Sequence, residues 1–271
     1  MKVEDYLVVG AGRMGGALLS GWLADPVSGV IAQHLFILDP KPGDDAQKAI
    51  KDGAVHLEKP SDKLSKVQTI LLAVKPQGFD KMAAVLAPYL QDGALIVSIL
   101  AGTSMDSLRA AFPKQHVIRA MPNTPAAIGA GMTAFTCDVN VSDRQKRVAE
   151  RLLKTGGKVH EVATEHLIDV VTAVSGSGPA YVFHMAEALE AAAIKVGLPE
   201  DLAPDFARQT IIGAGALLGR SDMSASELRH AVTSPNGTTQ AALDVLMPEL
   251  PPLLREAVKA ALRRAKELGK A

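Results

Sequence analysis

Two short segments of this chain place a backbone turn directly before a helix, an arrangement that binds anions. The first, Gly10 to Gly15, follows an apolar run and has the glycine spacing GxGxxG. Gly10 makes the tight turn, Gly12 lets a pyrophosphate approach the backbone, and Gly15 lets helix and strand pack closely. The helix that follows directs free N–H groups and its positive dipole end at the ligand. The motif predicts a dinucleotide site, and the alternative is a plain tight turn.

The second segment, Ser234 to Gln240, reads SPNGTTQ. It presents backbone N–H groups and three hydroxyls at the start of an expected helix, Gln240 to Met247. A small carboxylate accepts such bonds and is stabilised at the positive end of a helix. The capping box Ser224-x-x-Glu227 predicts the start of the helix before this segment. The alternative is that this segment only starts a helix.

Further polar side chains follow expected strands, where ligands of parallel sheets bind. Asp39 stands where a Rossmann fold hydrogen-bonds the adenosine ribose, and Lys75 places a cation at the end of its strand. Asn123 and Thr124 lie between two prolines in a stiff loop. The alternatives are that Asp39 merely ends a strand and that Lys75 is a solvated surface lysine. Several such loops on one sheet edge predict a cleft.

The elements that position these residues form an α/β half followed by a helical half. Strands are expected at residues 6–9, 35–38, 55–57, 69–74, 94–99, 116–120 and 159–162. The unbroken apolar run Thr69 to Val74 indicates a strand covered on both faces, as in a mostly parallel sheet. From Glu165 onward only helical periodicity is found. We therefore expect a dinucleotide-binding Rossmann domain at 1–163 and an all-helical dimerisation and substrate-binding domain at 164–271.

Two features of the helical half are unusual for a plain scaffold. Gly213-Ala214-Gly215-Ala216 lies inside an apolar helix, where each glycine costs roughly 1 kcal/mol. Such positions favour close approach of another helix, either across a dimer interface or within one subunit. Ser175 to Tyr181 reads as a flexible polar loop, with Pro179 in the first turn of the next helix.

Composition excludes several classes of function. Among 271 residues, 48% are hydrophobic, and 29 Lys and Arg balance 29 Asp and Glu, so nothing draws the chain to nucleic acid or an anionic membrane. The single cysteine, Cys137, excludes an internal disulfide. The seven histidines lack metal-ligand spacing, so no metal is expected, and no Gly-x-Ser-x-Gly or Cys–His nucleophile is found. Residues 1–5 carry acidic groups where a signal peptide would be apolar, so we expect a cytoplasmic protein. Hydride chemistry fits, because the cofactor carries the reactive atom.

Six ordered motifs make the chain resemble the pyrroline-5-carboxylate reductase family nearly end to end. They are VVGAGRMG, LLAVKPQ, VSILAG, RAMPNTPA, SGSGPAY and LRHAVTSPNGTTQAAL. The resemblance implies reduction of the cyclic imine 1-pyrroline-5-carboxylate to L-proline by NADPH or NADH, the last step of proline biosynthesis. It also implies a homodimer through the helical domain and higher assemblies such as a decamer built from dimers.

Carried onto matching positions, the resemblance implies a set of site residues. The cofactor phosphates are expected on Gly10, Ala11, Gly12, Arg13, Met14 and Gly15, and the ribose and nicotinamide near Ala73, Lys75, Ala101 and Asn123. The substrate-binding residues are expected to be Ser177, Ser234, Gly237 and Thr238. Thr239 is the expected catalytic residue, beside the ring nitrogen. A threonine hydroxyl is too weak an acid to donate efficiently at neutral pH, so Thr239 should orient the nitrogen and relay a proton from water.

The sequence departs from the family pattern at three positions. Asn236 stands where members often carry a second glycine, and asparagine tolerates the left-handed backbone better than most residues. His230 stands where members often carry aspartate, which puts any bond made by that acid in doubt. Asp39 would repel the 2′-phosphate of NADPH, which members commonly prefer, and so leans toward NADH, although Lys41 could partly offset it.

Two other functions remain open at this point. One is a related Rossmann reductase of another imine or of a hydroxy acid. The hydroxy-acid version requires a catalytic lysine on the first helices of the second domain. Lys195 lies late in its helix, which argues against that version. The other is a nicotinamide-nucleotide redox sensor without turnover.

Overall fold

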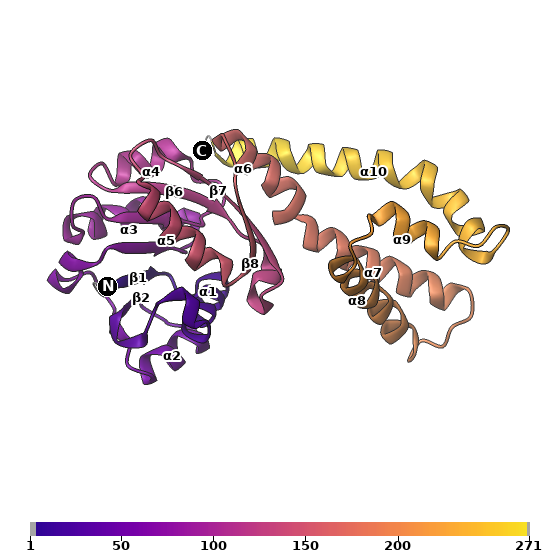
Figure 1. Ribbon diagram of the computed structural model, residues 1–271, viewed down its shortest axis with the longest axis horizontal. Helices are drawn as coiled ribbons and strands as arrows, with labels where there is room; N and C mark the ends of the chain where they lie inside the picture. The colour runs from indigo at the N-terminus through magenta and orange to yellow at the C-terminus, as the bar shows by residue number, and fades with distance from the viewer. Residues whose placement is uncertain (1–3, 270–271) are drawn as a thin grey trace. The chain divides into compact units, whose positions relative to one another are not determined.

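The computed structural model describes residues 4–269 of the chain (Figure 1). The chain falls into two compact units, residues up to 176 together with those from 261 onward, and residues 177–260. Residues 1–3, part of the stretch whose acidic groups underlie the expectation about a signal peptide, lie outside the described range. Within residues 4–269, no helix is both long and apolar enough to cross a membrane.

The first unit is built on one eight-stranded sheet with the order β3-β2-β1-β4-β5-β6-β7-β8. The strands are β1 (Tyr6–Val9), β2 (Leu35–Leu38), β3 (Val55–Leu57), β4 (Thr69–Leu72), β5 (Leu95–Ser98), β6 (His116–Met121), β7 (Gly131–Cys137) and β8 (Gly157–Glu161). All neighbours are parallel except β6 and β7. The first six strands have the Rossmann order, which reverses between β1 and β4 and leaves a ligand crevice at the carboxyl ends. The expected α/β fold with a mostly parallel sheet is confirmed.

Helices cover both faces of this sheet. Tyr6 and Val8 of β1 face a core shared with α1 (Arg13–Ala24), α2 (Asp44–Lys51) and α5 (Asp143–Lys154). Leu7 and Val9 face a second core with α3 (Phe79–Leu86) and α4 (Met105–Ala111). Successive strand residues point to opposite faces, so both faces are buried only when the run is apolar throughout. This confirms the two-sided burial expected from the unbroken apolar strands.

Strand β7 was not expected from the sequence. It begins with a glycine and contains two buried threonines, so neither an apolar run nor a clean alternation marks it. A Cβ at Gly131 would lie 2.6 Å from the Gly156 carbonyl oxygen, so only glycine fits this approach. The strand forms because β6 and β8 offer partners on both sides.

The segment expected as a loop at Ser175 to Tyr181 is helical, so that prediction is wrong. Helix α6 (Glu165–Val171) continues through a π-helical turn (Thr172–Gly176) into α7 (Gly178–Lys195). The Thr172 and Ser175 hydroxyls donate to the carbonyls of Ile168 and Val171, at 2.7 and 3.3 Å. Pro179 does lie in the first turn of α7. Helix α6 lies in the first compact unit, and the domain boundary after residue 163 stays a prediction.

The second unit is entirely helical within the described chain. It contains α7, α8 (Ala203–Arg220), α9 (Ala225–Ala231) and most of α10 (Thr238–Leu268), and α7 and α8 pack side by side (Figure 1). The capping box at the start of α9 is confirmed. Large apolar side chains stay exposed on these helices, among them Phe183, Phe206 and Val245.

The small residues of α8 face open space. A Cβ added at Gly213 or Gly215 would meet no atom within 4 Å. Within the second unit, therefore, no neighbouring helix packs against these two glycines.

Helix α10 is longer than the helix expected from the sequence. The expected helix Gln240 to Met247 continues past Pro248, Pro251 and Pro252 to Leu268. Proline removes one hydrogen bond and bends a helix. Because the three prolines are three and four residues apart, they lie on one face and leave the bonds of the opposite face in place. Its last turn belongs to the first unit, where Leu268 lies 3.1 Å from the position a Cβ on Gly102 would take.

Candidate cofactor and substrate sites

The glycine turn between β1 and α1 has the geometry expected of a phosphate site. Gly10 has a positive φ of 85°, and a Cβ there would lie 2.8 Å from the Val74 nitrogen. A Cβ on Gly15 would overlap the Gly10 carbonyl oxygen. Gly12 is different, because no atom lies within 4 Å of its added Cβ and no side-chain hydrogen bond caps the helix at this residue. The turn is therefore closely packed at Gly10 and Gly15 and open at Gly12. The uncapped N–H groups at the start of α1 can bind a pyrophosphate there.

Asp39 at the end of β2 is bonded to this turn. The Ala11 N–H donates to Asp39 Oδ2 at 2.7 Å, and the Lys41 N–H donates to Oδ1 at 2.7 Å. A carboxylate has about four acceptor positions, so each oxygen can accept one more hydrogen bond. Asp39 thus supports the glycine turn and retains acceptor capacity for ribose hydroxyls.

The other expected cofactor residues lie on the same edge of the sheet. Ala73 and Lys75 follow β4, Ala101 follows β5, and Asn123 follows β6. These strands are parallel neighbours, so their carboxyl ends meet at the edge that also carries the glycine turn. Lys75 and Ala101 are exposed. The structure therefore brings the expected cofactor residues to one edge of the first unit.

Asn123 has a second set of contacts that the sequence did not indicate. Its Nδ2 donates to the Ser175 carbonyl at 3.1 Å, and its Oδ1 accepts from the Met132 N–H at 2.9 Å. Both ends of the amide are thus held within the first unit. The side chain joins the end of β6 to the π-helical turn.

The expected substrate residues lie in the second unit. Ser234 to Gly237 forms a turn in which the Gly237 N–H donates to the Ser234 carbonyl at 3.0 Å. Asn236 has φ of 57°, so the expected left-handed backbone at this position is confirmed. A Cβ on Gly237 would overlap the Ser234 hydroxyl. Thr238 and Thr239 open α10, with Thr238 exposed and Thr239 half-buried.

Ser177 lies apart from this turn in sequence and stands directly before α7, half-buried. The cofactor residues thus gather in the first unit and the substrate residues belong to the second. That the two sets form one site stays a prediction.

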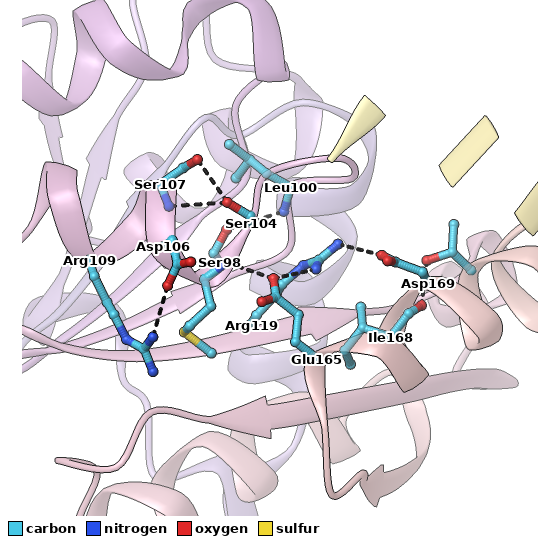
Figure 2. Close-up of polar contacts among 12 residues, drawn as sticks. Ser98, Leu100, Ser104, Asp106, Ser107, Arg109, Arg119, Glu165, Ile168 and Asp169 are labelled. Atoms are coloured by element: carbon cyan, nitrogen blue, oxygen red, sulfur yellow. Dashed lines mark hydrogen bonds and ion pairs between the residues drawn. The ribbon is translucent and has the colours of Figure 1, made fainter. Parts of the chain in front are cut away.

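The sequence did not lead us to predict an ion-pair cluster on β6. The carboxyl end of this strand belongs to the sheet edge that carries the expected cofactor residues, which we call the cofactor edge. Arg119 of β6, whose side chain is only 5% exposed, pairs with Glu165 and Asp169 of α6 (Figure 2). An arginine inside the apolar strand HVIRAM was a usable signal, because buried arginines require partners. Two carboxylates four residues apart, on one face of a helix further along the chain, were the matching signal.

Two observations concern thiol and metal chemistry in the described chain. Burial raises the pKa of the Cys137 thiol to about 11, so it carries no thiolate at neutral pH. Residues 4–269 contain no group of three or more His, Cys, Asp or Glu placed to hold a metal ion.

Comparison with known proteins matches both units. A family model described as pyrroline-5-carboxylate reductase dimerisation matches residues 165–268, and one described as NADP oxidoreductase, coenzyme F420-dependent, matches residues 6–102. Pyrroline-5-carboxylate reductase from Synechocystis is 39% identical over 268 residues, with 97% of each chain covered. The chain belongs to the pyrroline-5-carboxylate reductase family. The Pseudomonas aeruginosa relative of the same name is 36% identical, covering 99% of this chain and 98% of its own.

Solved structures give the same result. A pyrroline-5-carboxylate reductase from Coxiella burnetii matches with a TM-score of 0.90 at 31% identity, covering 100% of both chains. The Plasmodium falciparum pyrroline carboxylate reductase, solved with NADP bound, matches with a TM-score of 0.81 at 28% identity over 99% of each chain. The similarity thus covers both units of this chain.

Proposed function

We propose that this protein reduces 1-pyrroline-5-carboxylate to L-proline with a reduced nicotinamide cofactor. The observation that carries the proposal is similarity over nearly the whole chain to relatives named for this reaction. The open, uncapped helix start at Gly12 fits a cofactor pyrophosphate. When bound, a reduced nicotinamide supplies the hydride that the imine carbon accepts.

The second turn is proposed to bind the substrate. Backbone N–H groups at the start of α10 and the hydroxyls of Ser234 and Thr238 suit the substrate carboxylate, at the positive end of a 31-residue helix. Gly237 keeps this turn tight, and Ser177 is proposed to contact the same substrate. Thr239 is proposed to orient the ring nitrogen and relay a proton to it from water, because its own hydroxyl is too weak an acid.

NADH is the proposed preferred cofactor. The support is Asp39, whose carboxylate stands at the end of β2 where the adenosine ribose lies in Rossmann folds. Its charge repels a 2′-phosphate and accepts a hydrogen bond from a 2′-hydroxyl. Lys41 is close in sequence and offsets part of this repulsion.

A homodimer through the helices of the second unit is proposed, and a decamer built from such dimers is its larger form. The exposed apolar side chains of α7, α8 and α10 and the open space beside Gly213 and Gly215 support a second copy there. Light scattering of the purified protein measures the assembly. A monomer at micromolar concentration would contradict the dimer. The cytoplasmic location expected from the sequence stays a prediction.

Steady-state kinetics test the reaction. Purified protein should oxidise NADH, and NADPH more weakly, only when pyrroline-5-carboxylate is present. Thr239→Ala should lower kcat about 100-fold, the lower end of the range for loss of one positioned proton-transfer group, because a water can still reach the nitrogen. Thr210→Ala is the matched control, because Thr210 donates within α8 to the Phe206 carbonyl.

The alternatives predict other results. Turnover of a different imine or of a hydroxy acid, without turnover of pyrroline-5-carboxylate, would favour a related reductase. Cofactor binding with no turnover of any of these would favour a redox sensor.

A further inference from the structure

The Arg119 cluster joins three elements of the first unit. Arg119 Nη1 lies 2.6 Å from Glu165 Oε1, and Nη2 lies 3.1 Å from Asp169 Oδ1. Glu165 Oε1 also accepts from the Met105 N–H at 2.6 Å, which ties in the start of α4. Figure 2 shows the guanidinium between the two carboxylates. These bonds therefore fix the positions of strand β6, helix α4 and helix α6 relative to one another.

The contacts of Arg119 also constrain the π-helical turn that follows α6. Glu165 and Asp169 lie four residues apart on one face of α6, so a guanidinium that holds both fixes the rotation of the helix as well as its distance. Helix α6 passes directly into the turn Thr172–Gly176. π-helical turns are rare and occur often at functional sites.

The turn in turn holds the end of β6. The Ser175 carbonyl accepts from Asn123, and Met121 Cε lies 2.9 Å from the position a Cβ on Gly176 would take. Strand β6 is thus attached to the α6 segment twice, through Arg119 within the strand and through Met121 and Asn123 at its carboxyl end. A rotation of α6 would displace the Ser175 carbonyl and with it the Asn123 amide.

An arginine at position 119 is not expected to stabilise the fold more than an apolar side chain would. Desolvation offsets much of the attraction in a buried ion pair, and apolar replacements are often as stable. Arg119 Nε is buried and has no hydrogen-bond partner in the described chain, which adds a further penalty. What the forked guanidinium supplies, and an apolar side chain does not, is a fixed geometry between two carboxylates.

We propose that Arg119 is a positioning residue for the reduction: through Glu165 and Asp169 it sets the π-helical turn that holds the Asn123 amide at the cofactor edge of the sheet. The inference rests on the function proposed above, because the reaction is what the placement of Asn123 serves. Arg119 itself acts through other residues and is not a catalytic group.

Arg119→Lys is the main test, because lysine keeps the charge but presents one point donor instead of a fork. We expect kcat to fall about 10-fold or more, as small displacements of positioned groups do. The KM for NADH should change less than about twofold, because the glycine turn is untouched. The primary deuterium isotope effect on kcat, measured with cofactor deuterated at the transferred position, should rise. Amide hydrogen exchange should accelerate at residues 172–176 and stay unchanged at residues 10–15.

Two further variants separate positioning from folding. Asp169→Asn removes the charge of one of the two partners and leaves a weaker amide acceptor of the same shape, so it should reproduce the kinetic pattern more weakly. Arg109→Met is the matched control, because Arg109 makes an equally short 2.6 Å pair with Asp138 in the same unit but does not contact α6. It should lower the melting temperature while leaving kcat and the isotope effect at the wild-type values.

The outcomes are distinguishable. Wild-type kcat and isotope effect in Arg119→Lys, or losses that match those of Arg109→Met, would overturn the inference alone. A wild-type protein that binds NADH but reduces no pyrroline-5-carboxylate would overturn the proposed function and this inference with it.

Discussion

The carboxylate of Asp39 accepts a hydrogen bond from the Ala11 N–H at 2.7 Å, across 28 residues of sequence. The side chain expected to select the cofactor therefore also supports the turn expected to hold the cofactor phosphates. Selection and support depend on different properties of the same group. Repulsion of a 2′-phosphate needs the negative charge, whereas the bond from Ala11 needs only an acceptor oxygen.

Asp39→Asn separates these two properties, because asparagine keeps an acceptor oxygen and loses the charge. The KM for NADPH should fall about tenfold, equivalent to about 1.4 kcal/mol, with little change for NADH. Asp39→Ser should also lower the KM for NADPH relative to that for NADH. Asparagine keeps one acceptor oxygen for the Ala11 N–H and loses the bond from the Lys41 N–H, whereas the shorter serine side chain loses more of this support, so the melting temperature should fall more in Asp39→Ser than in Asp39→Asn. An unchanged KM for NADPH in both variants would contradict the role of Asp39 in cofactor choice.

Gly12→Ala and Gly15→Ala should behave differently. The Gly15 Cβ would overlap the Gly10 carbonyl oxygen, so Gly15→Ala should destabilise the folded protein severely. The Gly12 Cβ meets no protein atom within 4 Å, so Gly12→Ala should change the free energy of unfolding by less than about 1 kcal/mol. It should still weaken NADH binding about tenfold or more, about 1.4 kcal/mol, because the methyl group enters the space above the helix start. Calorimetry and fluorescence titration measure the two effects, and unchanged NADH affinity would place the pyrophosphate elsewhere.

Asn236 should tolerate glycine better than a branched residue. Its φ of 57° lies in the left-handed region, where a branched side chain costs about 1–2 kcal/mol or more. Asn236→Val should lower the free energy of unfolding by that amount and raise the KM for pyrroline-5-carboxylate, since the turn precedes Thr238. Asn236→Gly should keep the wild-type KM. Equal stability of the valine and glycine variants, by chemical denaturation, would show that the turn relaxes.

The Arg109–Asp138 pair should make stability depend on acid pH. The hydrogen bond from Arg109 holds the pKa of Asp138 below its ordinary value of 3.8. A carboxylate with a lowered folded-state pKa stabilises the protein above its ordinary pKa and loses that contribution as the pH falls toward the folded-state value. The melting-temperature difference between wild type and Arg109→Met should thus be constant at neutral pH and shrink below about pH 4. Lys114→Met, which breaks an exposed pair with Asp92 at 3.5 Å, is the control and should change little at any pH. A difference that grows in acid would contradict the assignment.

What the sequence determined by itself was local. The apolar runs of β1, β4, β5 and β6, the glycine turn and the capping box of α9 could all be predicted, because each depends on a few neighbouring residues. The left-handed Asn236 was equally predictable, since asparagine adopts that backbone more readily than most residues. So was the gathering of polar residues at one edge, which follows once the strands are parallel neighbours.

Only the tertiary structure decided the contacts between distant segments. Strand β7 exists because β6 and β8 pair with it, and its own residues carry no clear strand pattern. Arg119 meets Glu165 and Asp169 across 46 and 50 residues, and Asn123 meets Ser175 across 52. Periodicity and turn chemistry reflect local free energies, whereas these contacts form only after the sheet has brought its strands together. The two turns proposed to bind anions could therefore be predicted from the sequence, and the network proposed to position the cofactor edge was visible only in the fold.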